Sequence, residues 1–397
     1  MNLLHLISSV DPRGGGPMEG LRQVGSILSS QGHRVEVASL DDPGDPGVAD
    51  YPLPLHALGP GRGRYRYSPR LLPWLRRHAV DYDLVVVNGL WQYHGLAAWR
   101  ALAGDRVPYV VFTHGMLDPW FKHTYPLKHL KKWLYWPWAE YRLLRDAAAV
   151  LFTSEEERRL ARESFWLYRA RERVVAYGTR TPPTDRDALA AQFHACHPGL
   201  QGRRLLLFLG RIHEKKGCDL LVEAYGRVAA SDRRLHLVVA GPDPDGWVPR
   251  LRARAAALGV AERITWPGML QGDIKWGAFH AAEAFVLPSH QENFGIAVAE
   301  ALGCGLPVLI SDKVNIWREI EADGAGLVAT DTAEGTLQLL QRWLALEPAS
   351  RSAMAERARR SFAHRYTVQA MAVDLVAVYQ ESISDPAAVA AAAGAPR

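Results

Sequence analysis

The chain has 397 residues, of which 48% are apolar and 22% charged, which is enough for two α/β domains of ordinary size. Its three cysteines lack the spacing of a zinc site or a disulfide framework, and no stretch approaches the ~18 apolar residues of a membrane span. The start lacks the basic segment of a signal peptide. We therefore expect a cytoplasmic protein, free or held peripherally at the inner face of the membrane.

Charge is unevenly distributed along the chain. The net charge is +5, and residues 1–182 carry 24 Lys and Arg against 18 Asp and Glu. The first half is therefore the one expected to meet an anionic partner. A membrane surface or a phosphate-bearing acceptor fits better than nucleic acid, because the sequence contains no nucleic-acid-binding motif.

The first half alternates predicted strands and helices. A helix is expected over residues 18–31, and a long surface loop rich in Pro, Gly and Arg over residues 41–67. This alternation predicts parallel strands joined by right-handed crossovers, in a domain over residues 1–178. The strands are expected where Val and Phe cluster, at Leu3–Val10, Arg34–Leu40, Leu84–Asn88, Tyr109–Thr113, Ala149–Thr153 and Val174–Ala176.

The alternation stops and then restarts in the second half. Residues 179–202 hold several prolines and no clear strand, so we predict an interdomain linker there. A second α/β domain is expected over residues 203–365, and residues 386–397 are predicted to be a disordered, Ala-rich tail. The strands of this domain are expected at Leu205–Leu209, Leu235–Ala240, Ile264–Trp266, Phe285–Pro288 and Val308–Ser311.

The most informative motif runs from Ser289 to Val308. Glu292 and Glu300 stand eight positions apart, with Glu292 expected in the loop that opens a helix and Glu300 about two turns inside that helix. The first amides of a helix, here beside Gly295, favour a phosphate. Carboxylates on both sides favour hydroxyl-rich groups, so the pattern indicates a sugar attached to a nucleotide diphosphate.

This stretch resembles the Glu-x7-Glu signature of the retaining, nucleotide-sugar-dependent glycosyltransferases of the GT-B architecture (glycosyltransferase family 4, group 1). The Phe-Gly, Ala-Leu and Gly-x-Pro-Val frame around the two glutamates makes the resemblance specific. It implies two Rossmann-like domains facing each other across a cleft, the first binding the acceptor and the second the nucleotide sugar. It also implies a final helix, here residues 366–385, that crosses back to the first domain.

A second motif, Gly210–Gly217, resembles the family's Gly-Arg…Lys-Gly element. Arg211 and Lys216 follow the first strand of the second domain and can both reach one diphosphate. We expect them to be catalytic, stabilising the charge that grows on the leaving group in place of a metal ion. No metal or other cofactor is expected. Asp243-Pro244-Asp245 has the form of a metal-binding Asp-x-Asp, but a turn near the nucleotide is the favoured interpretation.

The resemblance assigns roles to further residues of the second half. Glu292 would hold hydroxyls of the donor sugar and belongs to the catalytic set, whereas Glu300 would bind the ribose. The nucleobase would meet the backbone that follows a strand. The expected donor-binding residues are Gly15, Gly16, Asn293, Phe294, Gly295, Ile296, Glu300, Met269 and Leu270.

The first half supplies one catalytic candidate and several acceptor candidates. His114 ends a strand where the family commonly has a histidine beside the reacting carbon, so it would donate to a donor-sugar hydroxyl or carry a proton. Glu19, one turn into the first helix, is a candidate acceptor contact. Asn88, Trp91 and His94 follow another strand and are expected to line the acceptor pocket, with ordinary loop packing as an equal alternative.

Residues Phe121–Arg145 mix lysines and arginines with many aromatic residues. Such a mixture is typical of helices that lie on a membrane surface, although Pro126 and Pro137 would break this one into pieces. The alternative is that the aromatic residues pack inward and the lysines are solvated. We predict contact with anionic lipid, near a lipid-linked acceptor.

Together these motifs predict a retaining, metal-independent hexosyltransferase that uses a nucleotide diphosphate sugar. The acceptor would be a hydroxyl of a glycan or a lipid-linked saccharide, in bacterial polysaccharide or lipopolysaccharide biosynthesis. Three alternatives stay open: a nucleotide-sugar epimerase, a glycogen- or sucrose-type synthase, and a non-catalytic membrane-associated scaffold of the same fold.

Overall fold

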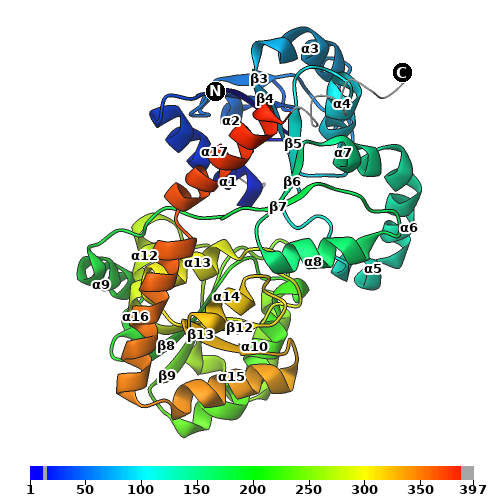
Figure 1. Cartoon of the computed structure of the whole chain (residues 1–397). Helices are drawn as coiled ribbons and strands as arrows, with labels where there is room; N and C mark the ends of the chain where they lie inside the picture. The colour runs from blue at the N-terminus through cyan, green and yellow to red at the C-terminus, as the bar shows by residue number, and fades with distance from the viewer. Residues whose placement is uncertain (12–15, 386–397) are drawn as a thin grey trace. The chain divides into compact units, whose positions relative to one another are not determined.

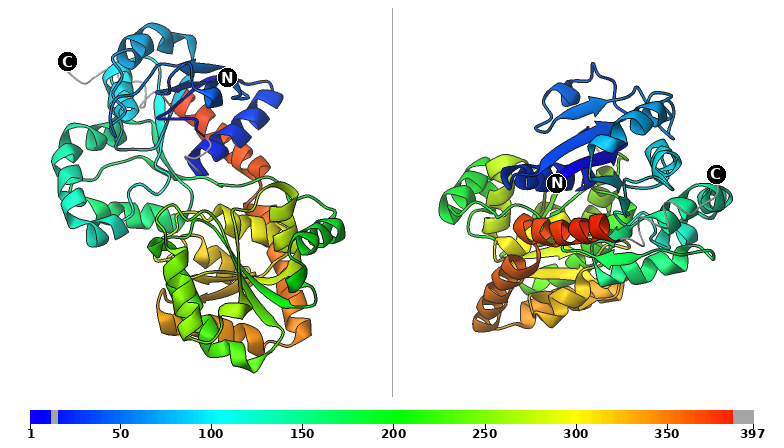
Figure 2. Two further views of the ribbon diagram at one scale, coloured as in Figure 1. Left: turned by 180° about the vertical axis from the view of Figure 1, so that it is seen from behind. Right: turned by 45° about the horizontal axis from the view of Figure 1, so that its top comes forward.

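The computed structural model describes residues 1–11 and 16–385 and divides into two compact units. The first unit contains Met1–Gly178 and the segment from Val368 onward, and the second contains Thr179–Thr367. Each unit is built on a parallel sheet with helices packed around it (Figures 1 and 2). The expected α/β class is therefore confirmed, whereas Gly15 and the predicted tail over residues 386–397 lie outside the described residues.

The sheet of the first unit has the order β3-β2-β1-β4-β5-β6-β7, and all its strand pairs are parallel. Because β1 lies between β2 and β4, the strand order reverses there, and open α/β sheets bind ligands at the carboxyl ends beside such a reversal. The strands are β1 (Asn2–Ile7), β2 (Arg34–Ser39), β3 (Leu55–Ala57), β4 (Leu84–Asn88), β5 (Tyr109–Phe112), β6 (Ala149–Phe152) and β7 (Glu172–Val174).

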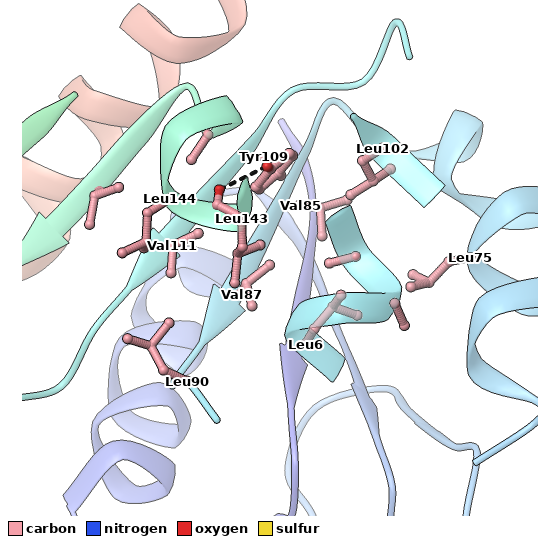
Figure 3. Packing of buried hydrophobic residues seen from close by; sticks show 14 of the residues in the cluster. Leu6, Leu75, Val85, Val87, Leu90, Leu102, Tyr109, Val111, Leu143 and Leu144 are labelled. Atoms are coloured by element: carbon pink, nitrogen blue, oxygen red, sulfur yellow. Dashed lines mark hydrogen bonds between the residues drawn. The ribbon is translucent and has the colours of Figure 1, made fainter. Parts of the chain in front are cut away.

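Helices pack on this sheet through buried apolar side chains. In Figure 3, Leu6, Val85 and Val111 of the central strands share one cluster with Leu102 and Leu143 of the helices. The principal helices are α1 (Gly16–Ser30), α3 (Leu71–His78), α4 (Tyr93–Leu102), α5 (Trp120–Thr124), α6 (Pro126–Tyr135), α7 (Glu140–Asp146), α8 (Glu155–Ser164) and α17 (Val368–Ser384).

Helix α17 belongs to the first unit, although it follows the whole of the second unit in the sequence. It packs against α1 and β4 and buries Met371, Leu375 and Tyr379. The Asp374 carboxylate accepts the Ala176 amide at 2.9 Å, and the Tyr379 ring meets His5 edge-on. This helix, which was expected to return to the first domain, is thus part of the core of that unit.

The second unit repeats the architecture with the order β10-β9-β8-β11-β12-β13, again all parallel. The strands are β8 (Arg204–Leu209), β9 (Leu235–Ala240), β10 (Ile264–Gly268), β11 (Ala282–Leu287), β12 (Val308–Ser311) and β13 (Gly326–Ala329). The helices are α9 (Arg186–Cys196), α10 (Cys218–Val228), α11 (Val248–Ala257), α12 (Gly272–Ala281), α13 (Ile296–Gly303), α14 (Trp317–Ala322), α15 (Ala333–Ala345) and α16 (Pro348–Arg365).

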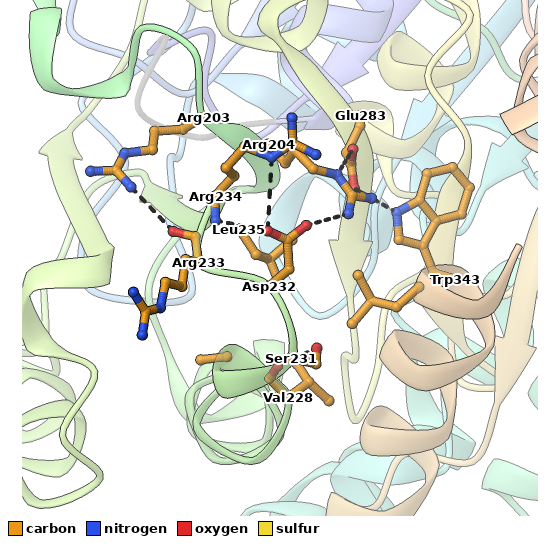
Figure 4. Close-up of polar contacts among 12 residues, drawn as sticks. Arg203, Arg204, Val228, Ser231, Asp232, Arg233, Arg234, Leu235, Glu283 and Trp343 are labelled. Atoms are coloured by element: carbon orange, nitrogen blue, oxygen red, sulfur yellow. Dashed lines mark hydrogen bonds and ion pairs between the residues drawn. The ribbon is translucent and has the colours of Figure 1, made fainter. Parts of the chain in front are cut away.

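An ion-pair cluster ties the amino end of the second sheet together (Figure 4). Arg204, the first residue of β8, contacts Asp232 at 2.6 Å and Glu283 of β11 at 2.8 Å. The indole Nε1 of Trp343 donates to Glu283 at 3.1 Å. These charged residues lie at the amino end of the sheet. They therefore do not occupy the carboxyl end of β8, where Gly210 follows.

The structure differs from the sequence-based expectations in four segments, one of which is β7, found at Glu172–Val174 instead of Val174–Ala176. Strand β3 lies inside the region expected to be a loop, and β13 was not expected; each has only three or four residues and edges its sheet, so its apolar pattern is weak. Residues 179–202 contain α9, which packs on α12 within the second unit. Gly277 permits that approach, because a Cβ there would lie 2.2 Å from the Leu189 carbonyl oxygen.

Candidate functional site

The two motifs of the second unit meet at an ion pair. Lys216 ends a short 3-10 turn after β8, and Glu292 lies in the loop between β11 and α13. The Lys216 ammonium contacts the Glu292 carboxylate, and the side chains are only 13% and 19% exposed. Burial alone would raise the pKa of Glu292, but the charge and hydrogen bond of Lys216 outweigh it, so the pKa is lowered and the carboxylate is ionised.

Backbone contacts hold these two loops together. Gly217 has φ +64°, and a Cβ at this position would lie 2.1 Å from the Pro288 carbonyl oxygen, so only glycine permits the approach. The His290 amide donates to the Lys215 carbonyl at 2.9 Å. The Glu292 amide donates to the Lys313 carbonyl at 2.9 Å. The ion pair is therefore positioned by main chain on both sides.

Glu300 stands nearer the start of its helix than we expected. Helix α13 begins at Ile296, after Gly295 at φ +76°, so Glu300 lies little more than one turn inside it rather than two. The expectation was wrong because the loop continues past Glu292. The Glu300 side chain is 10% exposed, and the Lys275 ammonium of α12 contacts it at 2.7 Å.

Other predicted site residues of the second unit also lie in loops that follow strands of the sheet. Arg211 is exposed and lies two residues after the end of β8, on the same loop as Lys216. Met269 and Leu270 follow β10, the edge strand, and Met269 is 61% exposed. Asp243 accepts the amides of residues 247 and 248 at 2.7 and 2.9 Å, which supports the turn interpretation. Within the described residues, no group of three or more His, Cys, Asp or Glu is arranged to hold a metal ion.

In the first unit, His114 and Asn88 lie together at the carboxyl ends of β5 and β4. His114 Nε2 is 3.3 Å from Asn88 Oδ1, and the Asn88 amide group donates to the Leu6 carbonyl at 3.3 Å. His114 has φ +48° and stacks on Phe112. Burial, helped by the neighbouring His5, lowers the pKa of His114 to about 3, so its imidazole is neutral at physiological pH.

The other acceptor candidates are held by internal contacts. His94 is buried and its Nε2 donates to the Asn88 carbonyl at 2.9 Å, which favours the loop-packing alternative for this residue. Trp91 is half-buried beside them. Glu19 accepts hydrogen bonds from Arg22 and Gln23 within α1, at 2.7 and 2.6 Å, so its carboxylate is already engaged. Gly16 is the first residue of the same helix.

Sequence reasoning missed three charged residues that organise these sites. Lys275, which contacts Glu300, and Glu140, which is buried below the β4 loop, carry no recognisable sequence signal. Glu157 accepts the Gly115 amide at 2.6 Å and so fixes the loop that carries His114. Its signal was available, because Ser154 and Glu157 have the spacing of a capping box, and the Glu157 amide donates to the Ser154 hydroxyl at 3.1 Å.

Two family models match the chain. The model described as a glycosyl transferase 4-like domain matches residues 15–178, and the model described as glycosyl transferases group 1 matches residues 195–361. The chain belongs to this glycosyltransferase family. The assignment confirms the resemblance drawn from the Glu292–Glu300 motif, and the second model covers the loops that carry Lys216 and Glu292.

Relatives that are named as glycosyltransferases support the same family assignment. The chain is 28% identical to an alpha-D-kanosaminyltransferase of Streptomyces kanamyceticus over 251 residues, which are 62% of this glycosyltransferase and 63% of that protein. It is 27% identical to a lipopolysaccharide core biosynthesis mannosyltransferase of Rhizobium leguminosarum bv. viciae over 271 residues, 61% of this chain and 74% of that one. The match therefore spans less than two thirds of the kanosaminyltransferase.

The fold is also found among solved structures. The Anabaena protein HepE, in complex with UDP and glucose, superposes with a TM-score of 0.74 at 16% identity, over 96% of this chain and 99% of that one. At this identity the likeness shows the fold, and that fold is the GT-B architecture expected from the sequence.

Proposed function

We propose that this glycosyltransferase moves a hexosyl group from a nucleotide diphosphate sugar to a hydroxyl of a glycan or a lipid-linked saccharide. The observation that carries the proposal is the partly buried Lys216–Glu292 pair, held by backbone contacts between the β8 and β11 loops. Ionised Glu292 offers two acceptor oxygens for sugar hydroxyls. Lys216 places a positive charge beside them, where a diphosphate would lie.

The proposed chemistry depends on stabilising the leaving group. As the glycosidic bond breaks, negative charge grows on the nucleoside diphosphate, and Arg211 and Lys216 would stabilise it without a metal ion. A front-face route retains the sugar's configuration: the departing phosphate oxygen takes the proton of the acceptor hydroxyl, whose oxygen bonds to the anomeric carbon. Because His114 is neutral, its role would be a hydrogen bond to the donor sugar rather than acid catalysis.

The relatives suggest a setting for this activity. One matched relative is named as a lipopolysaccharide core mannosyltransferase, and one solved neighbour holds UDP and glucose. Both support a hexose donor carried on a nucleotide and an acceptor in bacterial polysaccharide or lipopolysaccharide biosynthesis. A nucleotide-sugar epimerase would instead make product without an acceptor, and a scaffold would make none.

The test is a thermal-shift panel with UDP, GDP, ADP, dTDP and CMP, each with a chelator present. A ligand at ~100 times its dissociation constant stabilises the folded protein by roughly 2.7 kcal/mol, so one clear responder is expected. That responder would then be used as its hexose conjugate in a transfer assay. If no nucleotide raises the melting temperature, the donor site proposed here is wrong and the scaffold alternative takes its place.

The surface of α6 supports a second part of the proposal, contact with a membrane. Leu127, Leu130 and Leu134 point outward from this helix and are 78, 55 and 62% exposed. Trp133, Trp138 and Trp166 are exposed around them, and we call these six residues the α6 apolar surface. Only part of the segment packs inward, as Trp136 does by stacking on Phe165 at 4.1 Å between ring centroids.

The charge around the α6 apolar surface supports an anionic bilayer as its partner. Lys122, Lys128 and Lys131 are exposed on the same segment, and residues 119–139 contain no acidic residue. Exposed leucines and tryptophans among lysines suit the boundary between lipid headgroups and acyl chains. Among the described helices, none is both long enough and apolar enough to span a bilayer.

A further inference from the structure

A buried carboxyl group of the first unit has no part in the proposed chemistry. Glu140, the first residue of α7, is 1% exposed. Its Oε1 accepts the backbone N–H of Trp91 at 2.7 Å, and no described residue donates to its Oε2. Burial raises the pKa of Glu140 to about 7, although the Trp91 amide and the Lys132 charge oppose this. Burying a carboxyl group is unfavourable, which points to a structural role for Glu140 in this position.

That role concerns the backbone of Trp91. This residue has φ +71°, a left-handed conformation that is unfavourable for a side chain as large as tryptophan. Gly89, two positions earlier, is also left-handed at φ +90°. The Trp91 amide therefore points inward, where a hydrogen-bond acceptor is needed, and Glu140 supplies it. Glu140 is the acceptor that this strained backbone amide has in the structure.

Trp91 in turn joins two loops of the first unit. Its indole Nε1 donates to the Met116 carbonyl at 3.0 Å, and the Leu90 amide contacts the Met116 sulfur at 3.1 Å. Trp91 belongs to the loop after β4, which follows Asn88. Met116 belongs to the loop after β5, which carries His114. The 3.3 Å approach of His114 to Asn88 thus lies between two segments that Trp91 holds in register.

A second contact fixes the Trp91 ring. The Lys132 ammonium lies 4.3 Å from the centroid of this ring, and Lys132 comes from the inner face of α6. Burial lowers the pKa of Lys132 to about 8, and the negative charge of Glu140 acts against that change. Glu140 therefore holds the backbone of Trp91 while Lys132 covers its ring.

We propose that Glu140 is a positioning residue for the acceptor site, acting through the Trp91 amide to set the β4 and β5 loops that carry Asn88 and His114. The role rests on the proposed function, with Asn88 and Trp91 of the β4 loop lining the acceptor pocket and His114 of the β5 loop meeting the donor sugar beside it. Glu140 itself touches no substrate. Its effect on catalysis passes through one backbone hydrogen bond, so a side chain that keeps the acceptor atom keeps the effect.

The test compares Glu140→Gln with Glu140→Leu, since glutamine retains an Oε1 that accepts the Trp91 amide and leucine does not. The leucine variant should raise the KM for the acceptor at least tenfold and leave the nucleotide-induced thermal shift unchanged. The glutamine variant should restore the acceptor KM to within about threefold of the wild type. Trp91→Phe, which loses the indole donor but keeps an aromatic ring, should resemble the leucine variant and remains available if that variant does not fold.

Hydrogen exchange of fragments covering residues 89–93 gives a readout that needs no activity. Exchange should quicken in Glu140→Leu and stay slow in Glu140→Gln. If exchange changes in this way but the wild type transfers no sugar, the proposed function fails while the positioning contact stands. If exchange and acceptor KM are unchanged in Glu140→Leu, or equally perturbed in both variants, the positioning role is wrong.

Discussion

At the scale of single residues, the candidate site of the second unit contains an ion pair, in which Lys216 and Glu292 neutralise each other. Lys216 and Glu292 are both largely buried, and the charge of each offsets part of the cost of the other's desolvation. Replacing only one partner leaves an unpaired charge in the site. Stability and turnover therefore respond differently to the single and the double replacements, which makes the pair open to a double-mutant cycle.

Lys216→Ala is expected to lower kcat/KM by about 10² to 10³, because it removes a positive group placed for the leaving diphosphate. It should also lower the melting temperature, since Glu292 loses its counter-charge. The double variant Lys216→Ala with Glu292→Gln should recover stability but not turnover. Steady-state kinetics and thermal melts check both, with Arg234→Ala, an arginine whose side chain is 72% exposed, as control. Recovered turnover in the double variant would contradict the assignment.

The sequence motifs indicate candidate residues of the donor site, but not the residues that contact and support them. Glu292 and Glu300 stand in one motif and Lys216 in another, each visible in the chain, and the structure joins Lys216 directly to Glu292. Lys275 contacts Glu300 from a different helix, 25 positions away, so no local pattern indicates it. Glu140 is similar, because its partner is a backbone amide 49 positions earlier. Such contacts follow from tertiary packing alone.

At the scale of elements, α6 has one face that packs against the first unit and one that is exposed. Lys132 turns inward onto Trp91, whereas Leu127 and Leu134 point outward. The sequence indicated membrane contact for the whole segment but did not say which aromatic residues take part. Trp136 is fully buried, so it does not belong to the surface proposed to contact lipid. Three of the six surface residues are leucines, which the sequence interpretation had passed over.

Replacing Leu127 and Leu134 by Glu is expected to reduce binding to vesicles that contain anionic lipid by tenfold or more. Each leucine buried in the interface contributes roughly 1.5–3 kcal/mol, and the added charges are repelled. Vesicle co-sedimentation at low salt measures the effect. Val373→Glu is the control, because Val373 is 64% exposed on α17 and lies outside the α6 apolar surface. If the wild type fails to sediment with these vesicles, the membrane proposal is refuted.

Strands were predictable where the sheet buries them on both faces. Leu84–Asn88 forms a continuous apolar run, as expected of a central parallel strand, and β4 has the predicted bounds. The edge strands β3 and β13 were missed because they are short and only partly buried. Residues 179–202 were taken for a linker from their prolines, although Leu189 and Phe193 anchor α9. Packing against α12 stabilises the α9 helix, although the prolines around it favour a linker.

At the scale of the whole molecule, buried histidines link stability to pH. Burial lowers the pKa of His5 and His114 to about 3, and of His94 and His236 to about 4. Between these values and the ordinary 6.5, the unfolded chain binds protons that the folded protein does not. Stability is therefore lost as the pH falls below about 6.5. Glu140 acts in the opposite direction between 4.5 and 7, because its raised pKa makes the folded state bind the extra proton.

The histidines outnumber Glu140, so the melting temperature is expected to fall as the pH is lowered from 6.5 to 4.5. Each of these histidines contributes at most about 1.4 kcal/mol per pH unit within this window. Thermal melts across the range measure the slope. His94→Gln should make the slope smaller, and a slope unchanged by this replacement would show that His94 titrates normally in the folded protein.

The return of α17 to the first unit has a consequence for the order in which the protein matures. The second unit is continuous, from Thr179 to Thr367, so all of its residues have been synthesised before α17 is. The first unit begins earlier on the ribosome but lacks the helix that buries Met371, Leu375 and Tyr379 against α1 and β4. The part of the chain made first is thus the part completed last, and nascent α1 and β4 keep an apolar face that a chaperone can bind until α17 arrives.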